Sequence, residues 1–588
     1  PEKNSRKEKP ASTNLRKMPA QFGWALFIFA LLCNLSEGAV VPMSRPFAIT
    51  ALRSQLLSSR YTGKGVTVGV MSLSYNSLLK ENSDIQNGLL PGPGNPNNKK
   101  QAVVVLSDMP IGTHAKDEGR AMLQVVHGIA PDAKLCFIMP TSIADAIVQL
   151  ADKNGPCGAD IIADDVKLGY GPPFEDGPAD QEVDRFVAHG GIFFSAANNQ
   201  GAKAVLFPVR LVSRDSPRVH PALKAMRRYR FWTVFPDESV FRQYITKGRG
   251  DSIAQFYWNE PTGSVWTDFD LYIFDQSTMR MIASGTRNNI NRGLAFERVS
   301  FNMRGPGVIL IALGFVNRLP PKIPLPIPTI MGWLHVTASL KLENGTIAGH
   351  TGARSGFAVG AYDYRDTSKP TSMSSHGPVI RYWSINEVVG AVNGTVNHNI
   401  GGLEEIDIDG QGMFTQDISY RSEASLLSSV QGEVRFKPEF GSVHCLPTSV
   451  PLFTMFCGTS CAAPSAAGLA ALLKEMRPLL TRDILLMLVR RPGRRGVGAV
   501  RPTWHSQAGF GLLNGDQLMK DLTFINFSTI SSGSLPQSTP THTQGTYIAL
   551  SVLVSLAVAC VILVVLAFGI RALASRGRNE TVVTRIHI

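Results

Sequence analysis

The sequence contains few charged residues and few cysteines, and both facts limit the classes of protein to which it can belong. Of its 588 residues, 18% are charged and seven are cysteine. A charged fraction below the usual ~25%, with 54 Gly and 37 Pro spread along the chain, excludes a disordered chain, a coiled coil and a collagen-like rod. At roughly 100–200 residues per domain, the length indicates about three domains.

Positive charge exceeds negative charge, with 58 Lys and Arg against 45 Asp and Glu and a formal net charge of +13. The basic residues fall in separated clusters, among them 1–17, 227–230 and 490–495. Such clusters are typical of solvated faces and membrane flanks rather than of a groove for nucleic acid. We therefore expect no nucleic-acid partner.

One uncharged run, residues 547–570, is 24 residues long. As a helix it reaches ~36 Å, enough to cross a hydrocarbon core of ~30 Å. Arg571, Arg576 and Arg578 follow it immediately, and this positive charge places the C-terminal tail (571–588) in the cytoplasm. The sequence therefore predicts one transmembrane helix, preceded at 521–546 by a Ser/Thr-rich stalk.

A second, shorter apolar run at 22–33 follows a basic stretch. Its length suits the apolar part of a signal peptide within 1–38, and an uncleaved anchor is the alternative. Together the two runs predict a single-pass type I membrane protein, with its ectodomain in the secretory lumen or at the cell surface. Glycosylation sequons at Asn344, Asn393 and Asn526 agree with a glycoprotein.

The cysteine count limits the disulfides. Cys33 and Cys560 lie in the two apolar runs, and the other five are Cys136, Cys157, Cys445, Cys457 and Cys461. Because five is odd, at most two disulfides form and one thiol is left over. The sequence leaves the pairing open.

Short apolar runs alternate with helical patterns from about residue 63. The runs lie at 65–71, 102–106, 133–139, 159–163 and 191–196, and the helical patterns at about 118–128, 141–153 and 178–189. Continuous apolar strands separated by helices are typical of a parallel sheet covered on both faces. We expect an α/β wound sheet, with a first part at 46–205 and a second part at 346–520.

Between these two parts the alternation of strands and helices stops. Residues 225–345 contain several strand-like runs with no helix between them, which predicts an inserted β-sandwich. Within it, Asp268 and Asp270 lie on one strand face. Two such carboxylates can bind calcium, but solvated edge charges are the preferred interpretation.

A Ser at the start of a helix of small residues carries the clearest chemical signal. Residues 456–473 read Phe-Cys-Gly-Thr-Ser-Cys-Ala-Ala-Pro-Ser-Ala-Ala-Gly-Leu-Ala-Ala-Leu-Leu, with the Ser at position 460. A hydroxyl there lies at the positive end of the helix, which stabilises an alkoxide and a developing oxyanion. We expect Pro464 to be tolerated among the early N–H groups that have no helical partner. The alternative is a plain buried helix with a Ser cap.

This segment resembles the nucleophile region of subtilisin-like serine peptidases, whose pattern is Gly-Thr-Ser-x-Ala-Ala-Pro-x-x-Ala-Gly. The resemblance extends over most of 60–205 and 345–515. Further matching motifs begin at Val68, Ser195, Thr371, Lys437 and Gly509. The family's fold is an α/β wound parallel sheet, and its oxyanion-binding Asn falls on Asn199.

The general base departs from the family's pattern. The motif that carries the family's His reads Glu118-Gly-Arg-Ala here, which puts Glu118 at the His position. This substitution points to a subset of subtilisin-like proteins and to the related sedolisins, which pair Ser with Glu. His127 lies nine residues on, on the opposite face of the helix. His114 is a second candidate base if its loop folds back.

The family's Asp is also missing. It follows the first strand, where residues 72–74 read Ser-Leu-Ser, with Leu73 in the middle. Asp164 and Asp165, at the end of another core strand, are the candidates to supply a carboxylate instead. A Glu base becomes effective when burial or a second carboxylate raises its pKa.

The resemblance implies a membrane-anchored serine endopeptidase that cleaves polypeptides through an acyl-enzyme on Ser460. Glu118 would move the proton, and Asn199 would bind the oxyanion. The alternative is a catalytically inactive ectodomain that binds a protein or a glycan. We expect no metal and no cofactor, with calcium left open, and the sequence does not indicate an oligomeric state.

Overall fold

The structure is a computed structural model of the whole chain, and it describes residues 40–525 with several gaps. The gaps are 112–115, 167–172, 202–203, 209, 236, 247–249, 264, 266, 304–306, 317–328, 336–345, 385–432 and 492–503. The predicted signal peptide, stalk, transmembrane helix and tail, the three sequons and His114 therefore lie outside the described residues. Among the helices that are described, none combines the length and apolarity needed to cross a bilayer.

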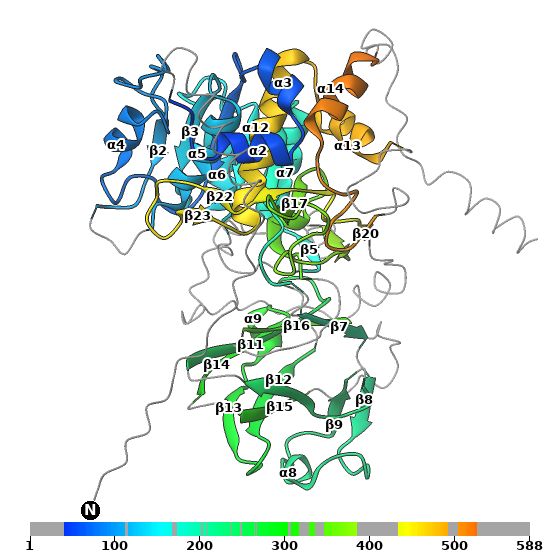
Figure 1. Cartoon of the computed structure of the whole chain (residues 1–588). Coiled ribbons are helices and arrows are strands. Elements are labelled where there is room, and N and C mark those ends of the chain that lie inside the picture. The colour runs from blue at the N-terminus through cyan, green and yellow to red at the C-terminus, as the bar shows by residue number, and fades with distance from the viewer. Residues whose placement is uncertain are drawn as a thin grey trace, which may run out of the picture. The chain divides into compact units, whose positions relative to one another are not determined.

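Seven strands form a central parallel sheet (Figure 1), in the order β2-β3-β1-β4-β6-β17-β21. The strands are β1 (Thr67–Met71), β2 (Val104–Ser107), β3 (Lys134–Ile138), β4 (Ile161–Asp164), β6 (Ile192–Ala196), β17 (Phe357–Asp363) and β21 (Phe440–His444). Apart from β2, nearly all of their side chains are buried, as expected for a sheet covered on both faces. The predicted α/β parallel sheet is confirmed.

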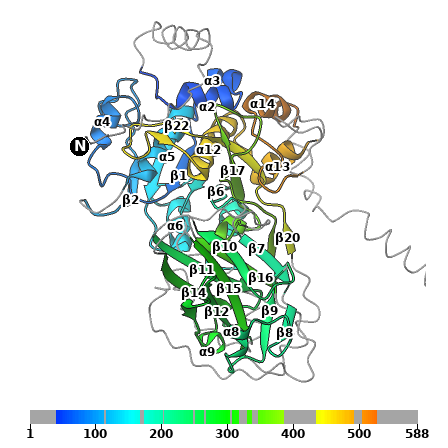
Figure 2. The ribbon, with the colours of Figure 1, turned by 60° about the horizontal axis from the view of Figure 1, so that its bottom comes forward.

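The helices of this part surround the sheet. They are α2 (Arg45–Ala51), α3 (Gln55–Arg60), α4 (Glu81–Gln86), α5 (Glu118–Ile129), α6 (Ile143–Ala151), α7 (Pro178–Ala188), α12 (Thr459–Met476), α13 (Arg482–Arg490) and α14 (Gly515–Thr523), with a 3₁₀ turn η1 (Gly349–Gly352). α12 packs against α5 and against β1, β4, β6, β17 and β21 (Figure 2). A Cβ on Gly468 of α12 would come within 3.0 Å of Ile129, so small residues bring the two helices together.

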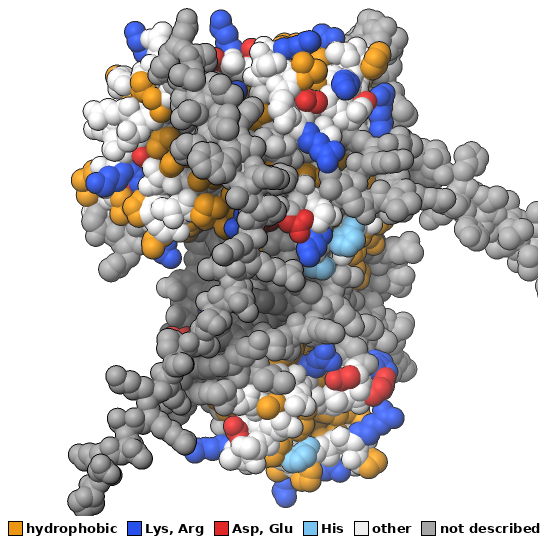
Figure 3. All heavy atoms as spheres, in the orientation of Figure 1, with side chains coloured by type: hydrophobic (Ala, Val, Ile, Leu, Met, Phe, Trp, Pro, Cys, Tyr) orange, Lys and Arg blue, Asp and Glu red, His pale blue; other side chains and the backbone are white. Residues whose placement is uncertain are grey.

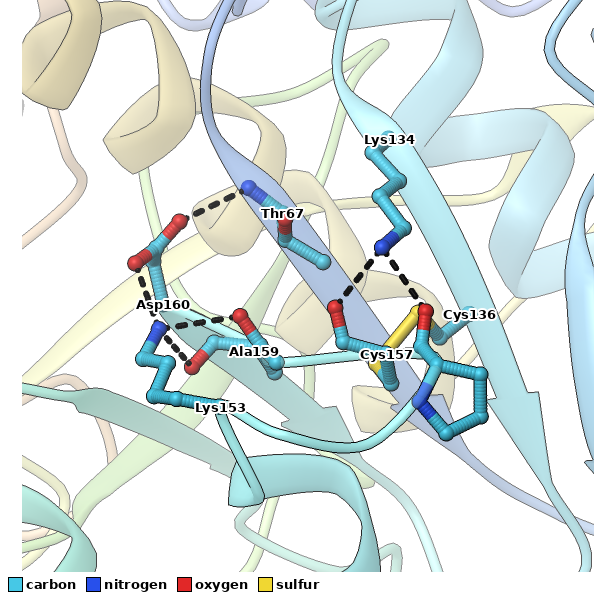
Figure 4. The surroundings of a disulfide bond; sticks show 9 residues. Thr67, Lys134, Cys136, Lys153, Cys157, Ala159 and Asp160 are labelled. Atoms are coloured by element: carbon cyan, nitrogen blue, oxygen red, sulfur yellow. Dashed lines mark hydrogen bonds and ion pairs between the residues drawn. A yellow bond between two sulfur atoms is a disulfide. The ribbon is translucent and has the colours of Figure 1, made fainter.

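The described residues contain two disulfides, which agrees with the predicted maximum. Cys136–Cys157 joins β3 to the segment before β4 (Figure 4), and Cys445–Cys457 closes a loop directly before α12. Cys461 is the buried free thiol.

A separate set of strands forms two antiparallel sheets. One has the order β13-β12-β15-β9-β8, with β10 also paired to β15, and the other has the order β14-β11-β16-β7. Their bounds are β7 (Ala204–Pro208), β8 (Arg210–Ser213), β9 (Phe231–Val234), β10 (Arg242–Thr246), β11 (Gly250–Trp258), β12 (Phe269–Asp275), β13 (Met281–Gly285), β14 (Phe296–Met303), β15 (Gly307–Phe315) and β16 (Thr329–His335). Side chains from both sheets, including Phe256, Leu271 and Ile311, share one apolar cluster.

The preferred interpretation of Asp268 and Asp270 as solvated edge charges is wrong. Asp268 is 3% exposed and Asp270 is fully buried. The face of β12 that carries Asp270 is covered by a second cluster, which includes Tyr229 and Trp232. The sequence pattern did not indicate that this face is buried. The side chains that cover it come from residues 219–240, which include α8 (Pro221–Lys224), and not from the strands next to β12 in sequence.

The remaining elements are short. They are β5 (Glu175–Asp176), β18 (Val379–Arg381), β19 (Trp383–Ser384), β20 (Glu433–Arg435), β22 (Leu446–Pro447), β23 (Met455–Phe456) and α9 (Asn289–Arg292). β22 pairs with β23 to form the hairpin closed by Cys445–Cys457.

Candidate active site

Ser460 is the second residue of α12 and is partly exposed, whereas nearly all of the helix after it is buried. Its backbone N–H belongs to the first turn, whose N–H groups have no partner within a helix. The hydroxyl therefore lies at the positive end of an 18-residue helix. Pro464 is the sixth residue, beyond the first turn, so our placement of it was wrong because the helix begins at Thr459. It removes the helical hydrogen bond to the Ser460 carbonyl.

Asn199 is held against the residues that precede Ser460. Its amide oxygen accepts hydrogen bonds from the Thr459 backbone N–H at 2.9 Å and from the Thr459 hydroxyl at 3.1 Å. A Cβ on Gly458 would lie 2.9 Å from the Asn199 amide nitrogen, and Gly458 has φ +100°. Only glycine suits this position. The oxygen of the Asn199 amide is thus engaged, and its nitrogen faces the start of α12.

Glu118 is the first residue of α5 and is half-buried. Burial raises the pKa of Glu118, while hydrogen bonds from Asp165 and from the Ser460 hydroxyl, and the charge of Lys116, offset part of that rise. The structure therefore brings the Glu118 carboxyl and the Ser460 hydroxyl together, although the two residues begin different helices.

The loop after β1 is held to the start of α5 by hydrogen bonds to Asp117. Asp117 is buried, has φ +55°, and accepts hydrogen bonds from the Ser74 hydroxyl at 3.1 Å and from the Ser77 N–H at 3.0 Å. Arg120 forms an ion pair with it at 3.1 Å. Asp117 therefore has a structural role and points away from Glu118. It fixes the backbone from which Glu118 projects.

Asp165 occupies the region where the family's Asp is missing. β1 and β4 are parallel neighbours with Met71 opposite Asp164, and the Asp165 N–H donates to the Met71 carbonyl at 3.3 Å. Asp165 consequently lies beside Ser72, whose hydroxyl partly opposes the rise of the Asp165 pKa. Burial, the charge of Glu118 and the charge of Asp164 raise that pKa well above its usual range.

Asp164 points elsewhere, since successive residues of a strand face opposite sides of the sheet. Its carboxylate accepts a hydrogen bond from the Ser195 hydroxyl at 2.6 Å and contacts the His350 ring nitrogen at 2.7 Å. Of the two candidate carboxylates in the sequence, the structure brings Asp165 to Glu118 and leaves Asp164 in a buried polar network.

His127 is not part of this arrangement. His127 is buried near the end of α5, and burial lowers its pKa to about 4. The charges that act on it are those of Lys99, Asp132 and Arg45, in agreement with its predicted place on the opposite face from Glu118. His114 lies outside the described residues.

One group of side chains within the described residues has the spacing of a metal site, namely His444, Cys445 and Cys457. Its two sulfur atoms are bonded to each other, so neither is a thiolate ligand. Cys457, the last residue of this group, lies three residues before Ser460 in the chain.

The arrangement has the components of acyl transfer. A partly exposed hydroxyl lies at a helix N-terminus, a carboxyl with a raised pKa lies close enough to interact with it, and an amide is held by the residue before it. Residues with positive φ stand next to each component, with Asp117 before Glu118, Asn198 before Asn199, and Gly458 two residues before Ser460. Such conformations persist only where surrounding contacts enforce them, and they cluster at functional sites.

Comparisons with known proteins give matches among solved structures alone, at low identity and low TM-score. No protein-family model matches the chain, and no curated protein matches it. Among solved structures, MycP1 from Mycobacterium smegmatis is 14% identical with a TM-score of 0.31, over 82% of this chain and 87% of that one. The serine protease of Aeromonas sobria is 12% identical with a TM-score of 0.33, over 84% and 69%.

A protease from Pseudoalteromonas arctica is likewise 12% identical with a TM-score of 0.31, over 83% of this chain and 96% of that one. At TM-scores this low the matches establish neither the family nor the reaction. The seven-stranded parallel sheet itself fits the subtilisin-like fold that the sequence resemblance implies. The chemistry has to be inferred from the side chains of this chain.

Proposed function

We propose that the chain is a membrane-anchored serine-type endopeptidase of the subtilisin-like class, with Glu118 in the role of the base. The observation that carries this proposal is the proximity of the Ser460 hydroxyl to the Glu118 carboxyl, which lowers the pKa of Glu118 against the effect of burial. A hydroxyl is activated when a base accepts its proton, and a carboxylate whose pKa is raised is a stronger base than a free one.

In the proposed reaction, the Ser460 oxygen attacks the carbonyl carbon of the scissile peptide bond while its proton moves to Glu118. The negative charge that forms on the carbonyl oxygen is stabilised by the Asn199 amide nitrogen and the Ser460 backbone N–H. Glu118 then gives the proton to the leaving amine, which departs and leaves an acyl-enzyme. Water, with Glu118 again as base, releases the acid and restores Ser460.

Asp165 acts in this proposal as a positioning residue. It has the stronger tendency of the two carboxyls to keep its proton, because it is buried and lies next to both Glu118 and Asp164. A protonated Asp165 donates a hydrogen bond to Glu118 and holds it in the ionised form that accepts the Ser460 proton.

The parts outside the described residues complete the proposal. The segment 1–38 would direct the chain into the secretory pathway, and 547–570 would anchor it with the tail 571–588 in the cytoplasm. The two antiparallel sheets would be the inserted β-sandwich, and the substrate would be a polypeptide.

The second candidate function is a binding ectodomain without turnover. The observation that favours it is the absence of a carboxylate at 72–74, where Ser72 is buried and Leu73 is 47% exposed. In that case Glu118 and Asp165 would only be two neighbouring carboxyl groups beside an unreactive hydroxyl.

Labelling with a fluorophosphonate separates the two functions. The full-length protein would be incubated with the probe between pH 4 and pH 8, and modified peptides would be identified by mass spectrometry. We expect labelling at Ser460 in the wild type and in Ser465→Ala, and none in Ser460→Ala. Ser465 is a suitable control because it is buried on the same helix, with its hydroxyl bonded to the Cys461 carbonyl at 2.8 Å. An unlabelled wild type at every pH would support the binding function.

A further inference from the structure

The disulfide Cys445–Cys457 ends three residues before Ser460. It closes the β22–β23 hairpin, in which Leu446 pairs with Phe456. Cys457 is exposed, and Cys445 is 5% exposed. Cys457, at one end of this bond, is therefore exposed to solvent next to the candidate active site.

His444 connects this disulfide to the backbone that leads into α12. A ring nitrogen of His444 and the two sulfur atoms all lie within 4.8 Å of one another. The Nδ1 of His444 accepts the Gly458 N–H at 2.9 Å. The tautomer inferred from this bond carries its proton on Nε2, and burial lowers the His444 pKa to about 4, so the ring is neutral near pH 7. The disulfide, the imidazole and Gly458 thus form one packed unit.

The backbone at both ends of the bond has a conformation that L-residues seldom adopt. Cys445 has φ +61°, and Gly458, next to Cys457, has φ +100°. Thr459 follows and donates to Asn199. The disulfide between Cys445 and Cys457 therefore helps to hold Gly458 and Thr459. These two residues position both the nucleophile and the oxyanion-binding amide.

The other disulfide has the opposite surroundings. Cys136 is fully buried and Cys157 is 3% exposed, within an apolar cluster that includes Ile162 and Leu150. Figure 4 shows the Lys134 ammonium group donating to the Cys157 carbonyl beside it. A thiol in solution has no direct access to this bond, so it serves as an internal control.

We propose that Cys445–Cys457 is a thiol–disulfide exchange site through which a dithiol reductant lowers the reactivity of Ser460. The effect on Ser460 rests on the proposed function, whereas the exchange itself does not. The substrate class is a dithiol, either a small molecule or a protein with two vicinal thiols.

The exchange is balanced in two steps. A thiolate of the reductant attacks the sulfur of the exposed residue Cys457, the bond to Cys445 breaks, and Cys445 leaves as a thiolate that takes up a proton. The second thiol of the reductant then attacks the mixed disulfide and releases Cys457, while the reductant becomes a cyclic disulfide. In total the protein gains two electrons and two protons.

Reduction removes the covalent tie three residues before the nucleophile, so Gly458 and Thr459 are held by hydrogen bonds alone. A displacement of about 1 Å at a reacting group costs on the order of a hundredfold in rate. We expect the rate of labelling at Ser460 to fall by roughly ten- to hundredfold, and to recover when the bond is reoxidised.

The test uses the full-length protein, graded dithiothreitol, and two readouts on the same samples. Alkylation followed by mass spectrometry shows which cysteines have been reduced, and a fluorophosphonate reports the reactivity of Ser460. We expect Cys445 and Cys457 to be alkylated first, with Cys136 and Cys157 still joined, and the labelling rate to fall in step with that alkylation.

Variants separate this effect from general damage. Cys445→Ser with Cys457→Ser should label slowly without reductant and show no further response to it. Cys136→Ala with Cys157→Ala should keep the wild-type response, and so should Cys461→Ser. Alkylation of Cys136 and Cys157 before the other pair would overturn the exchange site, and unchanged labelling after selective reduction would overturn the coupling to Ser460. If the oxidised protein does not label at all, the proposed function fails, while the alkylation order still decides whether the exchange site exists.

Discussion

Two regions of this molecule bury carboxyl groups on or beside their strands, and only one of them has the surroundings for catalysis. At the carboxyl ends of β1 and β4 in the parallel sheet, Glu118 and Asp165 lie next to the partly exposed Ser460. In the antiparallel sheets, burial raises the pKa of Asp268 to about 6 and that of Glu297 to about 7. The direction of the pKa shift and its first cause are the same in both regions.

The neighbours of the carboxyls differ. In the antiparallel region Asp270 accepts the Tyr229 hydroxyl, Asp268 accepts the Asn289 N–H at 3.2 Å, and Glu297 accepts the N–H of Arg298 at 3.0 Å. Around Glu118 the neighbours are an aliphatic hydroxyl at a helix N-terminus and a second carboxyl. A raised pKa therefore reports burial, and a site for acyl transfer also needs a reactive hydroxyl and donors for an oxyanion.

Among the changes outside the carboxyl groups, the largest effect is expected for Asn199→Ala. Loss of one oxyanion donor typically costs about 10²–10³ in rate. We expect the rate of phosphonylation at Ser460 to fall by that amount, measured as labelling against time. Thr459→Val is the matched control, since it removes the hydroxyl bond to Asn199 and keeps the amide. A loss of less than about tenfold is expected there, and equal losses in both variants would assign Asn199 a structural role.

A smaller effect, with a distinctive pH dependence, is expected at Asp165. Glu118 must be ionised to accept a proton, so labelling should rise as the pH passes the pKa of Glu118. It should fall again when Asp165 loses its proton and can no longer donate to Glu118. Asp165→Asn donates at every pH, so we expect it to keep the acid limb and lose the alkaline limb of the pH–rate profile.

Asp165→Ala provides the comparison for that variant. A hydrogen bond to an ionised group contributes about 1.5–3 kcal/mol, which is roughly ten- to hundredfold in rate. We expect such a loss at all pH values. An unchanged alkaline limb in Asp165→Asn would show that another group controls it.

In the antiparallel region we expect an effect on stability and none on labelling. The folded-state pKa of Asp268 is raised, so the folded chain binds the proton more tightly and stability falls as the pH rises from about 4 to about 6. Asp268→Asn keeps the acceptor for Asn289 and removes the buried charge. It should stabilise this region by up to about 3 kcal/mol at pH 7, and by little at pH 4.

Hydrogen exchange of β12 peptides, followed by mass spectrometry at both pH values, measures this difference. Equal protection of wild type and Asp268→Asn at pH 7 would contradict a buried, destabilising carboxylate. A change in Ser460 labelling would contradict the separation of the two regions.

Much of the parallel-sheet region was predictable from sequence because its signals are local. The helix predicted at about 118–128 is α5 (Glu118–Ile129), and the run at 191–196 contains β6 (Ile192–Ala196). Apolar strands, small residues on a helix and a Gly-Thr-Ser turn determine local structure within a few residues. The limit of two disulfides with one spare thiol also followed from counting alone.

What the sequence left open or predicted wrongly depends on contacts between segments that are distant in sequence. The role of Asp165 follows from the register of β4 against β1, which decides whether Asp164 or Asp165 faces Glu118. The burial of Asp270 follows from residues 219–240, which cover one face of β12. No periodicity within either segment contains that information.

The most direct test of the account measures the rate of labelling at Ser460 in Glu118→Gln against the wild type across pH 4–8. Glu182→Gln on α7 is the control, because Glu182 pairs with the exposed Arg185 away from Ser460. We predict that Glu118→Gln, folded as the wild type by circular dichroism, labels about 10²–10⁴-fold more slowly, since a general base is worth that much. Labelling of Glu118→Gln at the wild-type rate would contradict the claim that Glu118 takes the Ser460 proton.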